Sequence, residues 1–197
     1  MKEIKSIDMW RESVKLFYDQ DACNGCAICI QACPKEAITL NPVGASIRGE
    51  IEESPITVDP EKCVICGVCA ALCPEEAFKV MINGVESLLV IENEALPRGV
   101  GFEGDIRVDT DKCPKGCSTC VEVCREEAIE FDKEIKLDEE KCTYCGACIL
   151  VCPSEAITLK RTKLISETEP ETKIMKKLKK SLLGEVTLGG ISKKEDE

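Results

Sequence analysis

Residues 23–34 read CNGCAICIQACP, in which four cysteines follow the spacing C-x2-C-x2-C-x3-C and precede a proline. The same spacing returns at residues 63–74 (CVICGVCAALCP) and 142–153 (CTYCGACILVCP). A variant with one extra residue stands at 113–125 (CPKGCSTCVEVCR). Similar segments lead into the groups (DPEKC, DEEKC) and out of them (CPKEAITL, CPSEAITL). The chain is therefore built on a fourfold internal repeat.

The composition points to metal centres. The chain has 197 residues with 16 cysteines, no histidine, and only 4 Phe, 2 Tyr and 1 Trp. So few aromatic side chains cannot fill an ordinary core of this size, so disulfides or metal centres must supply part of the stability. The lack of histidine excludes cysteine–histidine zinc fingers, Rieske centres, histidine-ligated haem and histidine-based acid/base catalysis.

Net charge and hydropathy limit the kinds of partner and the cell compartment that we expect. With 26 basic and 37 acidic residues the net charge is -11, which is the wrong sign for binding nucleic acid. The N-terminal segment lacks the apolar stretch of a secretory signal, and no run of 18 apolar residues occurs, so we expect no membrane-spanning segment and do not favour a membrane as a partner. We expect a cytoplasmic protein, in which reduced thiols bind metal and do not form disulfides.

The spacing within the groups favours iron and sulfide. Three cysteines two residues apart on a tight loop reach three corners of a cubane cluster, and the fourth ligand comes from elsewhere. An all-cysteine zinc site, the main alternative, uses two C-x2-C pairs separated by a longer stretch. The first, second and fourth groups are therefore interpreted as iron–sulfur sites.

The pattern C-x2-C-x2-C-x3-C-P resembles that of bacterial-type ferredoxins with two [4Fe-4S] clusters, in which the fourth cysteine ligates the other cluster of the pair. Across about residues 16–160 the chain resembles two such ferredoxins in tandem, a polyferredoxin. The resemblance implies four clusters, each with its own ligand set. Set one is Cys23, Cys26, Cys29 and Cys73; set two is Cys63, Cys66, Cys69 and Cys33; set three is Cys113, Cys117, Cys120 and Cys152; set four is Cys142, Cys145, Cys148 and Cys124.

The implied fold class is α+β, with two tandem ferredoxin-like domains of short strands and helices and a C-terminal helical tail. The expected divisions are an N-terminal segment (1–15), domain one (16–92), a connecting loop (93–105), domain two (106–160) and a tail (161–197).

Short β-branched or aromatic pieces predict the strands. They lie at 16–18, 56–58, 106–108 and 157–159, and a hairpin is expected from 129–131 and 135–137. One or two helical turns are expected after three of the groups, at 34–37, 74–77 and 153–156, with proline in the first turn.

The third group departs from the pattern, because three residues separate its first two cysteines and Arg125 replaces the proline. Gly116 is expected to absorb the extra residue. The site is interpreted as a four-iron cluster of altered geometry, with a [3Fe-4S] cluster, a labile site or a differently ligated iron as alternatives. Arg125 is either solvated or raises the potential of the nearby cluster.

Two insertions interrupt the repeats, at residues 41–55 and at about 81–105. In the second, Asn83-Gly84 predicts a hairpin turn between FKVMI and VESLLVI, followed by a loop. This insertion either docks a neighbouring subunit or caps and bridges its own domains. The string G-x-G-x-x-G at Gly99, Gly101 and Gly104 lacks a strand-to-helix context and does not predict dinucleotide binding.

Residues 168–184 predict one helix that ends at Gly184, with an apolar stripe of Ile174, Leu178 and Leu182 joined by Met175. Three placements are open for this basic amphipathic helix: on a partner, on its own domain, or on an anionic membrane. The last residues, 191–197, are expected to be disordered.

No residue set stands out for bond chemistry, so the chain is interpreted as a non-catalytic relay for single electrons. The segments VKLFYDQDACNGCAIC, NPVGASIRG and FKVMINGVES resemble the polyferredoxin subunits F of formylmethanofuran dehydrogenases. That resemblance implies a hetero-oligomeric complex in which low-potential electrons reach a catalytic oxidoreductase subunit that reduces CO2 in methanogenesis, with other iron–sulfur proteins as partners. The alternatives are a subunit of a hydrogenase, heterodisulfide reductase or other oxidoreductase, a free ferredoxin-like carrier, and a zinc-stabilised interaction module.

Overall fold

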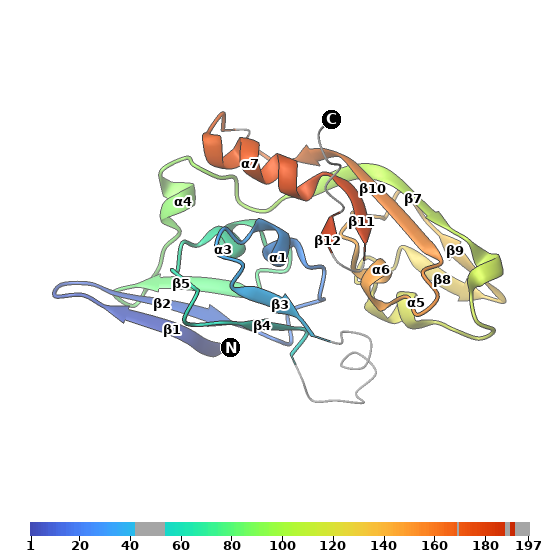
Figure 1. Cartoon of the computed structure of the whole chain (residues 1–197), viewed down its shortest axis with the longest axis horizontal. Coiled ribbons are helices and arrows are strands. Elements are labelled where there is room, and N and C mark those ends of the chain that lie inside the picture. The colour runs from blue at the N-terminus through green and yellow to red at the C-terminus, as the bar shows by residue number, and fades with distance from the viewer. Residues whose placement is uncertain (42–53, 169, 188–189, 192–197) are drawn as a thin grey trace.

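The computed structural model describes residues 1–41, 54–168, 170–187 and 190–191 (Figure 1). Most of the insertion expected at 41–55, and residues 192–197 of the tail expected to be disordered, lie outside the described residues. The described chain forms two halves of similar plan. Each half has a four-stranded sheet, a two-stranded ribbon and two short helices that carry cysteines.

The first half is organised around the antiparallel pair β2 and β5, in a sheet of order β1-β2-β5-β6. Its elements are β1 (Lys2–Asp8), β2 (Ser13–Tyr18), α1 (Ile28–Ala32), β3 (Ile38–Leu40), β4 (Ile56–Val58), α3 (Val68–Leu72), β5 (Phe78–Ile82) and β6 (Val85–Glu86). Leu16 and Val80 are buried on this sheet, and the rings of Tyr18 and Phe78 lie 5.0 Å apart. The expected N-terminal segment is thus a strand of this sheet.

The second half repeats the plan around β7 and β10, in a sheet of order β12-β11-β10-β7. Its elements are β7 (Gly101–Val108), the 3-10 turn η1 (Thr110–Lys112), α5 (Thr119–Val123), β8 (Ile129–Asp132), β9 (Glu134–Leu137), α6 (Ala147–Val151), β10 (Ile157–Ile165), β11 (Gly184–Thr187) and β12 (Gly190–Ile191). Between and after the repeats lie α4 (Leu89–Glu92) and α7 (Lys173–Leu182).

The expected strand positions and the hairpin of β8 and β9 are confirmed, but several boundaries are wrong. Strand β7 begins at Gly101, inside the stretch expected as a loop, and β10 continues to Ile165, inside the expected tail. The Asn83-Gly84 turn joins β5 and β6 as expected, but the second arm of that hairpin is only two residues long and is followed by α4.

The helical turns expected after the cysteine groups do not form. Residues 34–37 and 74–77 are turns, because Glu36 and Glu76 have φ values of 50° and 49° in the left-handed region, which a right-handed helix cannot contain. Residues 153–156 turn in the same way at Glu155, where φ is 50°. The short helices lie instead just before the fourth cysteine of each group.

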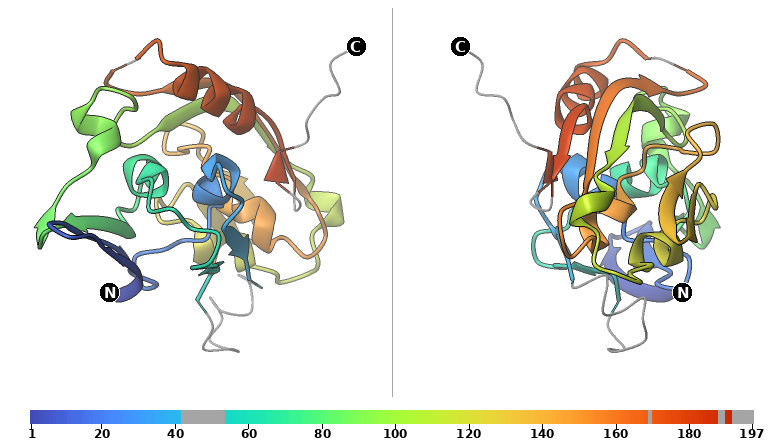
Figure 2. Two further views of the ribbon diagram at one scale, coloured as in Figure 1. Left: turned by 60° about the vertical axis from the view of Figure 1, so that its left-hand side comes forward. Right: turned by 90° about the vertical axis from the view of Figure 1, so that its right-hand side faces the viewer.

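One of the two apolar core clusters extends across both halves, and the other lies within the first half. Figure 2 shows the two halves from two further directions. Buried residues of α1 and α3, such as Ile28 and Leu72, belong to the same apolar cluster as Ile149 of α6 and Leu159 of β10. The residues after α4 run between the halves: Leu96 is buried in this cluster. The second insertion therefore bridges its own domains.

Helix α7 packs on its own chain, against α1 of the first half and β10 of the second. Met175, Leu178 and Leu182 are buried, whereas Ile174 is 46% exposed, so the expected stripe is wrong at that residue. The Thr172 hydroxyl caps the helix by accepting a hydrogen bond from the Met175 amide at 3.1 Å. Of the three placements open to this helix, the one on its own chain is observed. Among the residues that the structure describes, no helix has the length and apolar character to cross a bilayer.

One glycine of the G-x-G-x-x-G string, Gly104, is required for strand packing. Gly101 and Gly104 lie in β7 beside β10. A Cβ atom on Gly104 would stand 2.3 Å from the Lys160 carbonyl oxygen, so only glycine lets the two strands approach this closely.

Candidate metal centres

Each cysteine loop curls through left-handed backbone next to its second cysteine. The residue before that cysteine has positive φ in all four groups: Gly25 (72°), Ile65 (50°), Gly116 (76°) and Tyr144 (52°). The residue after it has positive φ in three: Ala27 (61°), Gly67 (78°) and Gly146 (85°). These turns fold the first three cysteines of each group around one region, as a cluster site requires.

The third group differs at Ser118. Gly116 adopts positive φ as expected, but so does its counterpart in every other group, so it is not the residue that distinguishes this loop. The residue after the second cysteine, Ser118, has a φ of -123° where the others are left-handed. The helix α5 still begins at the next residue and carries Cys120.

The fourth cysteine of every group accepts a backbone hydrogen bond that sequence reasoning did not identify. The amide four residues later donates to the sulfur: Ala37 to Cys33 (3.4 Å), Ala77 to Cys73, Ala128 to Cys124 and Ala156 to Cys152 (3.3 Å each). The left-handed glutamate before each alanine turns this N–H back onto the sulfur. Such bonds stabilise a thiolate. At Cys152, burial raises the pKa, but the amides of Ala156 and Ser154 outweigh it and the pKa is lowered.

Backbone hydrogen bonds join the groups in pairs. The backbone N–H of the aspartate before one group donates a hydrogen bond to the carbonyl oxygen of the alanine after another group. The four pairs are Asp19 and Ala77 (2.8 Å), Asp59 and Ala37 (2.7 Å), Asp109 and Ala156 (2.8 Å), and Asp138 and Ala128 (2.8 Å). The start of group one thus lies at the end of group two, and the reverse also holds. Groups three and four are joined in the same way.

Two cavities collect cysteines from both members of a pair. One is lined by Cys33 together with Cys63, Cys66 and Cys69, which are the members of set two. The other is lined by Cys124 together with Cys142, Cys145 and Cys148, which are the members of set four.

Cysteines of sets one and three affect one another's pKa. Burial raises the pKa of Cys73, and the nearby Cys23 thiol raises it further. Burial also raises the pKa of Cys113, and Cys152 is the next largest cause. Burial raises the pKa of Cys120 to about 11, with contributions from the other three cysteines of set three. The two cavities thus bring together the cysteines of sets two and four, whereas sets one and three stay predictions.

The cysteine thiols are available to hold a metal cluster. All sixteen cysteines are described and free of disulfides. Among the residues that the structure describes, no three His, Cys, Asp or Glu side chains converge on one point where a metal ion would sit. A tetrahedral zinc site needs its thiolates about 2.3 Å from one ion, whereas the thiolates of a [4Fe-4S] cluster bind different irons and stand apart. Burial raises the pKa of Cys26, Cys69 and Cys148, which favours neutral thiols unless a metal binds the thiolates.

Arg125 links the two halves. Its guanidinium donates to the Asp21 carbonyl oxygen at 2.9 Å and lies 3.4 Å from a Glu75 carboxylate oxygen, both in the first half. The side chain is therefore not simply solvated, and sequence reasoning did not foresee this contact across 104 residues.

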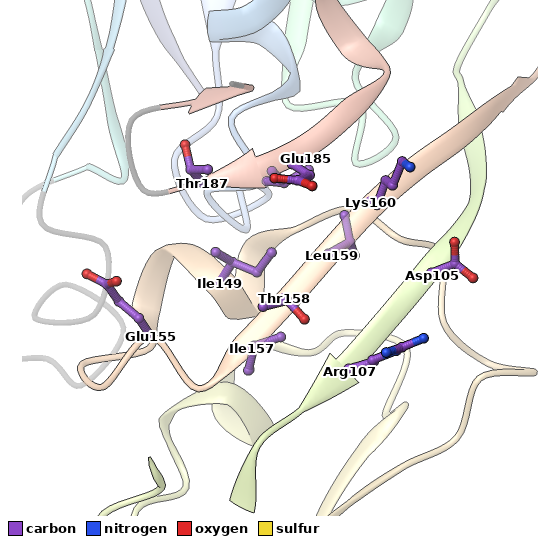
Figure 3. Close-up of a pocket in the computed structure, with 11 residues that line it drawn as sticks. Asp105, Arg107, Ile149, Glu155, Ile157, Thr158, Leu159, Lys160, Glu185 and Thr187 are labelled. Atoms are coloured by element: carbon purple, nitrogen blue, oxygen red, sulfur yellow. The ribbon is translucent and has the colours of Figure 1, made fainter. Parts of the chain in front are cut away.

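A separate groove of about 710 Å³ lies between β11 and the start of β10, beside α6 (Figure 3). Its lining includes three carboxylates, Asp105, Glu155 and Glu185, and two basic side chains, Arg107 and Lys160. None of its lining residues is a cysteine, so the groove is distinct from the four cysteine sites.

Comparison with known proteins identifies the relatives of the chain. The 4Fe-4S dicluster domain family matches residues 22–77, and the 4Fe-4S binding domain family matches residues 135–158. A ferredoxin of Methanothermococcus thermolithotrophicus is 44% identical over 59 residues, which cover 28% of this chain and 97% of that ferredoxin. This chain belongs to the ferredoxin family. It is an iron–sulfur electron-transfer protein with [4Fe-4S]-type domains.

Two other relatives match the present chain over part of their own length. Pyruvate synthase subunit PorD of Methanothermobacter marburgensis is 41% identical over 56 residues, which cover 28% of this chain and 65% of that protein. A subunit of the ion-translocating oxidoreductase complex of Methanosarcina acetivorans is 44% identical over 46 residues, which cover 23% of this chain and 17% of that protein. The activities of these two proteins do not follow for this chain from such partial matches.

A solved structure resembles this ferredoxin over nearly its whole length. It is a chain of the formate dehydrogenase, heterodisulfide reductase and formylmethanofuran dehydrogenase complex from Methanospirillum hungatei. The TM-score is 0.83 at 24% identity, and the match covers 96% of this chain and 91% of that chain. At this identity the likeness concerns the fold, and it confirms the expected α+β, ferredoxin-like architecture.

Proposed function

We propose that this ferredoxin holds four [4Fe-4S] clusters in the cross-ligated sets one to four and relays single electrons through them. The observation that carries the proposal is the pair of cavities lined by the four cysteines of set two and the four of set four, each set drawn from two groups. The clusters supply the one-electron redox chemistry. The chain supplies the thiolates, the N–H groups that stabilise them, and a buried setting.

The proposed order of the relay is two, one, four, three. Burial raises the pKa of Cys29 of set one, and the nearby thiol of Cys69 of set two raises it further. Cys148 of set four is affected in the same way by Cys120 of set three. Across the halves, burial raises the pKa of Cys26 of set one, and Cys145 of set four is the next largest cause. Sets one and four are therefore the inner sites and sets two and three the outer ones.

Set two is the proposed terminal on the first half. Cys66 is the one exposed cysteine among the sixteen, and its neighbour Val64 is 50% exposed. A partner that covers this loop would approach the cluster of set two more closely than any inner cluster. Set three lies at the other end of the proposed order and is therefore the second proposed terminal.

The cross-ligation is tested with Cys33→Ser. The change should abolish the same electron paramagnetic resonance signal as Cys63→Ser, because both residues belong to set two, and should leave the signal that Cys23→Ser abolishes. The matched variant Cys73→Ser should do the opposite. Loss of the Cys23-dependent signal in Cys33→Ser would overturn the assignment.

We further propose that this ferredoxin is a subunit of a larger oxidoreductase, with formylmethanofuran dehydrogenase as the favoured partner and methanogenesis as the setting. The supporting observations are the near-complete fold match to a chain of a complex that contains that enzyme, and the sequence resemblance to its polyferredoxin subunits. Anaerobic purification of the tagged chain from its own organism tests this. We expect the catalytic subunit of formylmethanofuran dehydrogenase to co-purify. A different catalytic subunit would assign another complex, and a lone chain would indicate a free carrier.

A further inference from the structure

Arg161 of β10 is the one charged side chain that is buried among the residues that the structure describes, with 1% of its surface exposed. Its guanidinium donates hydrogen bonds only to neutral acceptors. These are the carbonyl oxygens of Tyr144 (2.9 Å), Cys145 and Leu182 (3.4 Å), and the side-chain oxygen of Gln31 (3.0 Å). The charge also lies 4.1 Å from the centre of the Phe102 ring.

No carboxylate within the described chain forms an ion pair with Arg161. Burial lowers the pKa of this guanidinium to about 10, and the two groups that oppose this effect are the thiols of Cys26 and Cys145. An unpaired buried charge is costly, so the chain gains by placing anions beside it. Cys26 belongs to set one and Cys145 to set four, on opposite sides of the boundary between the halves.

Gln31 gives a second, independent indication at the same place. It lies in α1 of the first half, and its side-chain oxygen is held by Arg161. Its amide nitrogen is buried and has no hydrogen-bond partner. A buried donor without an acceptor calls for an explanation, and the sulfur atoms of a cluster would be acceptors for it.

We propose that Arg161 is a positioning residue that serves as the common counter-charge of the clusters in sets one and four and raises the potentials of both, where electrons cross between the halves. This inference rests on the proposed four-cluster relay. Reduction of either cluster adds one electron and therefore one negative charge, which a buried cation stabilises. Net charge and hydrogen bonds to sulfur are established determinants of cluster potential. Because the cation is shared, it acts on both inner sites and on neither outer one.

The test is a redox titration of the whole iron-loaded protein, followed by electron paramagnetic resonance, in Arg161→Met and Arg161→Lys. In Arg161→Met, the two signals that depend on Cys26 and Cys145 should become harder to reduce by about tenfold, equivalent to about 59 mV for one electron. The outer signals should stay in place. Lysine keeps the charge and should restore most of the shift. The control is Arg107→Met, which removes the same charge from an exposed position on β7.

A second variant covers the case in which Arg161→Met does not fold. Gln31→Glu is nearly isosteric and places a carboxylate against the guanidinium, so it should pair with the cation and lower the same two potentials. Unshifted inner potentials in either variant, even with lower thermal stability, would reduce Arg161 to a structural tie and overturn the inference. Iron is counted first in the unaltered protein. A count far below about 16 irons per chain would defeat the four-cluster proposal itself, whereas a full count with unshifted potentials defeats only the role of Arg161.

Discussion

Leu182 closes the contact between α7 and the rest of the molecule, and its replacement by alanine tests whether this helix holds the two halves together. The side chain is completely buried (0% exposed) and lies in the core that both halves share. The change removes three carbon atoms, which at about 0.8 kcal/mol each amounts to a lost transfer free energy of about 2.4 kcal/mol. Incomplete collapse of the cavity raises the expected cost to about 3 kcal/mol.

For a chain of this size a loss of 1 kcal/mol lowers the Tm by roughly 2–4 °C, so Leu182→Ala should lower it by about 6–12 °C. The assay is thermal unfolding of the iron-loaded protein under anaerobic conditions, followed by far-ultraviolet circular dichroism at one fixed scan rate, because metal release makes the transition irreversible.

The matched control is Ile174→Ala on the exposed side of the same helix. Alanine is a better helix former than isoleucine, so this change should alter stability by no more than about 0.5 kcal/mol. Equal effects of the two variants would refute the packing of α7 on its own chain and reopen its placement on a partner.

Three further outcomes follow from the structure. Gly104→Ala should destabilise the protein by about 3 kcal/mol or prevent its accumulation, because the new Cβ would meet the Lys160 carbonyl oxygen at 2.3 Å. Gly101→Ala is the control and should be tolerated, because its Cβ would be 3.8 Å from the nearest atom. Thermal unfolding distinguishes the two variants. Arg125→Gln should cost no more than about 1 kcal/mol by the same assay, because the arginine of its ion pair with Glu75 is exposed to solvent, and a larger loss would mean that this contact is essential to the joining of the halves. Removal of iron with a chelator should abolish most secondary structure in circular dichroism, because binding of the thiolates to metal contributes directly to the free energy of folding; an apo protein with native helices and strands would contradict this.

Short-range sequence signals predicted much of this architecture. The cysteine spacing, the β-branched triplets and the Asp132–Glu134 turn indicated the repeats, the short strands and the ribbon of β8 and β9, all of which depend on contacts between near neighbours. The helices were misplaced because Pro34 and the residues after it were read as a helix start. Glu36 has a left-handed backbone, which directs the Ala37 amide to the Cys33 sulfur. The sequence of a single repeat does not indicate this conformation.

Contacts between the halves were beyond sequence reasoning, because they join residues that are 50 to 130 positions apart. Arg161 and Gln31 are separated by 130 residues, and nothing local indicates that they are in contact. One signal was present: Ile157, Leu159 and Arg161 alternate with exposed residues along β10, so the arginine falls on the inward face of the strand. A charged residue in phase with apolar ones is a pattern that calls for a search for a buried anion.

Iron, zinc and acid-labile sulfide per chain, measured on anaerobically purified protein, test the central claim most directly. Four clusters in sets one to four predict about 16 irons with matching sulfide and no zinc. About 15 irons would indicate a three-iron centre, with the altered third group as its expected place. Zinc in place of iron and sulfide would contradict the relay altogether.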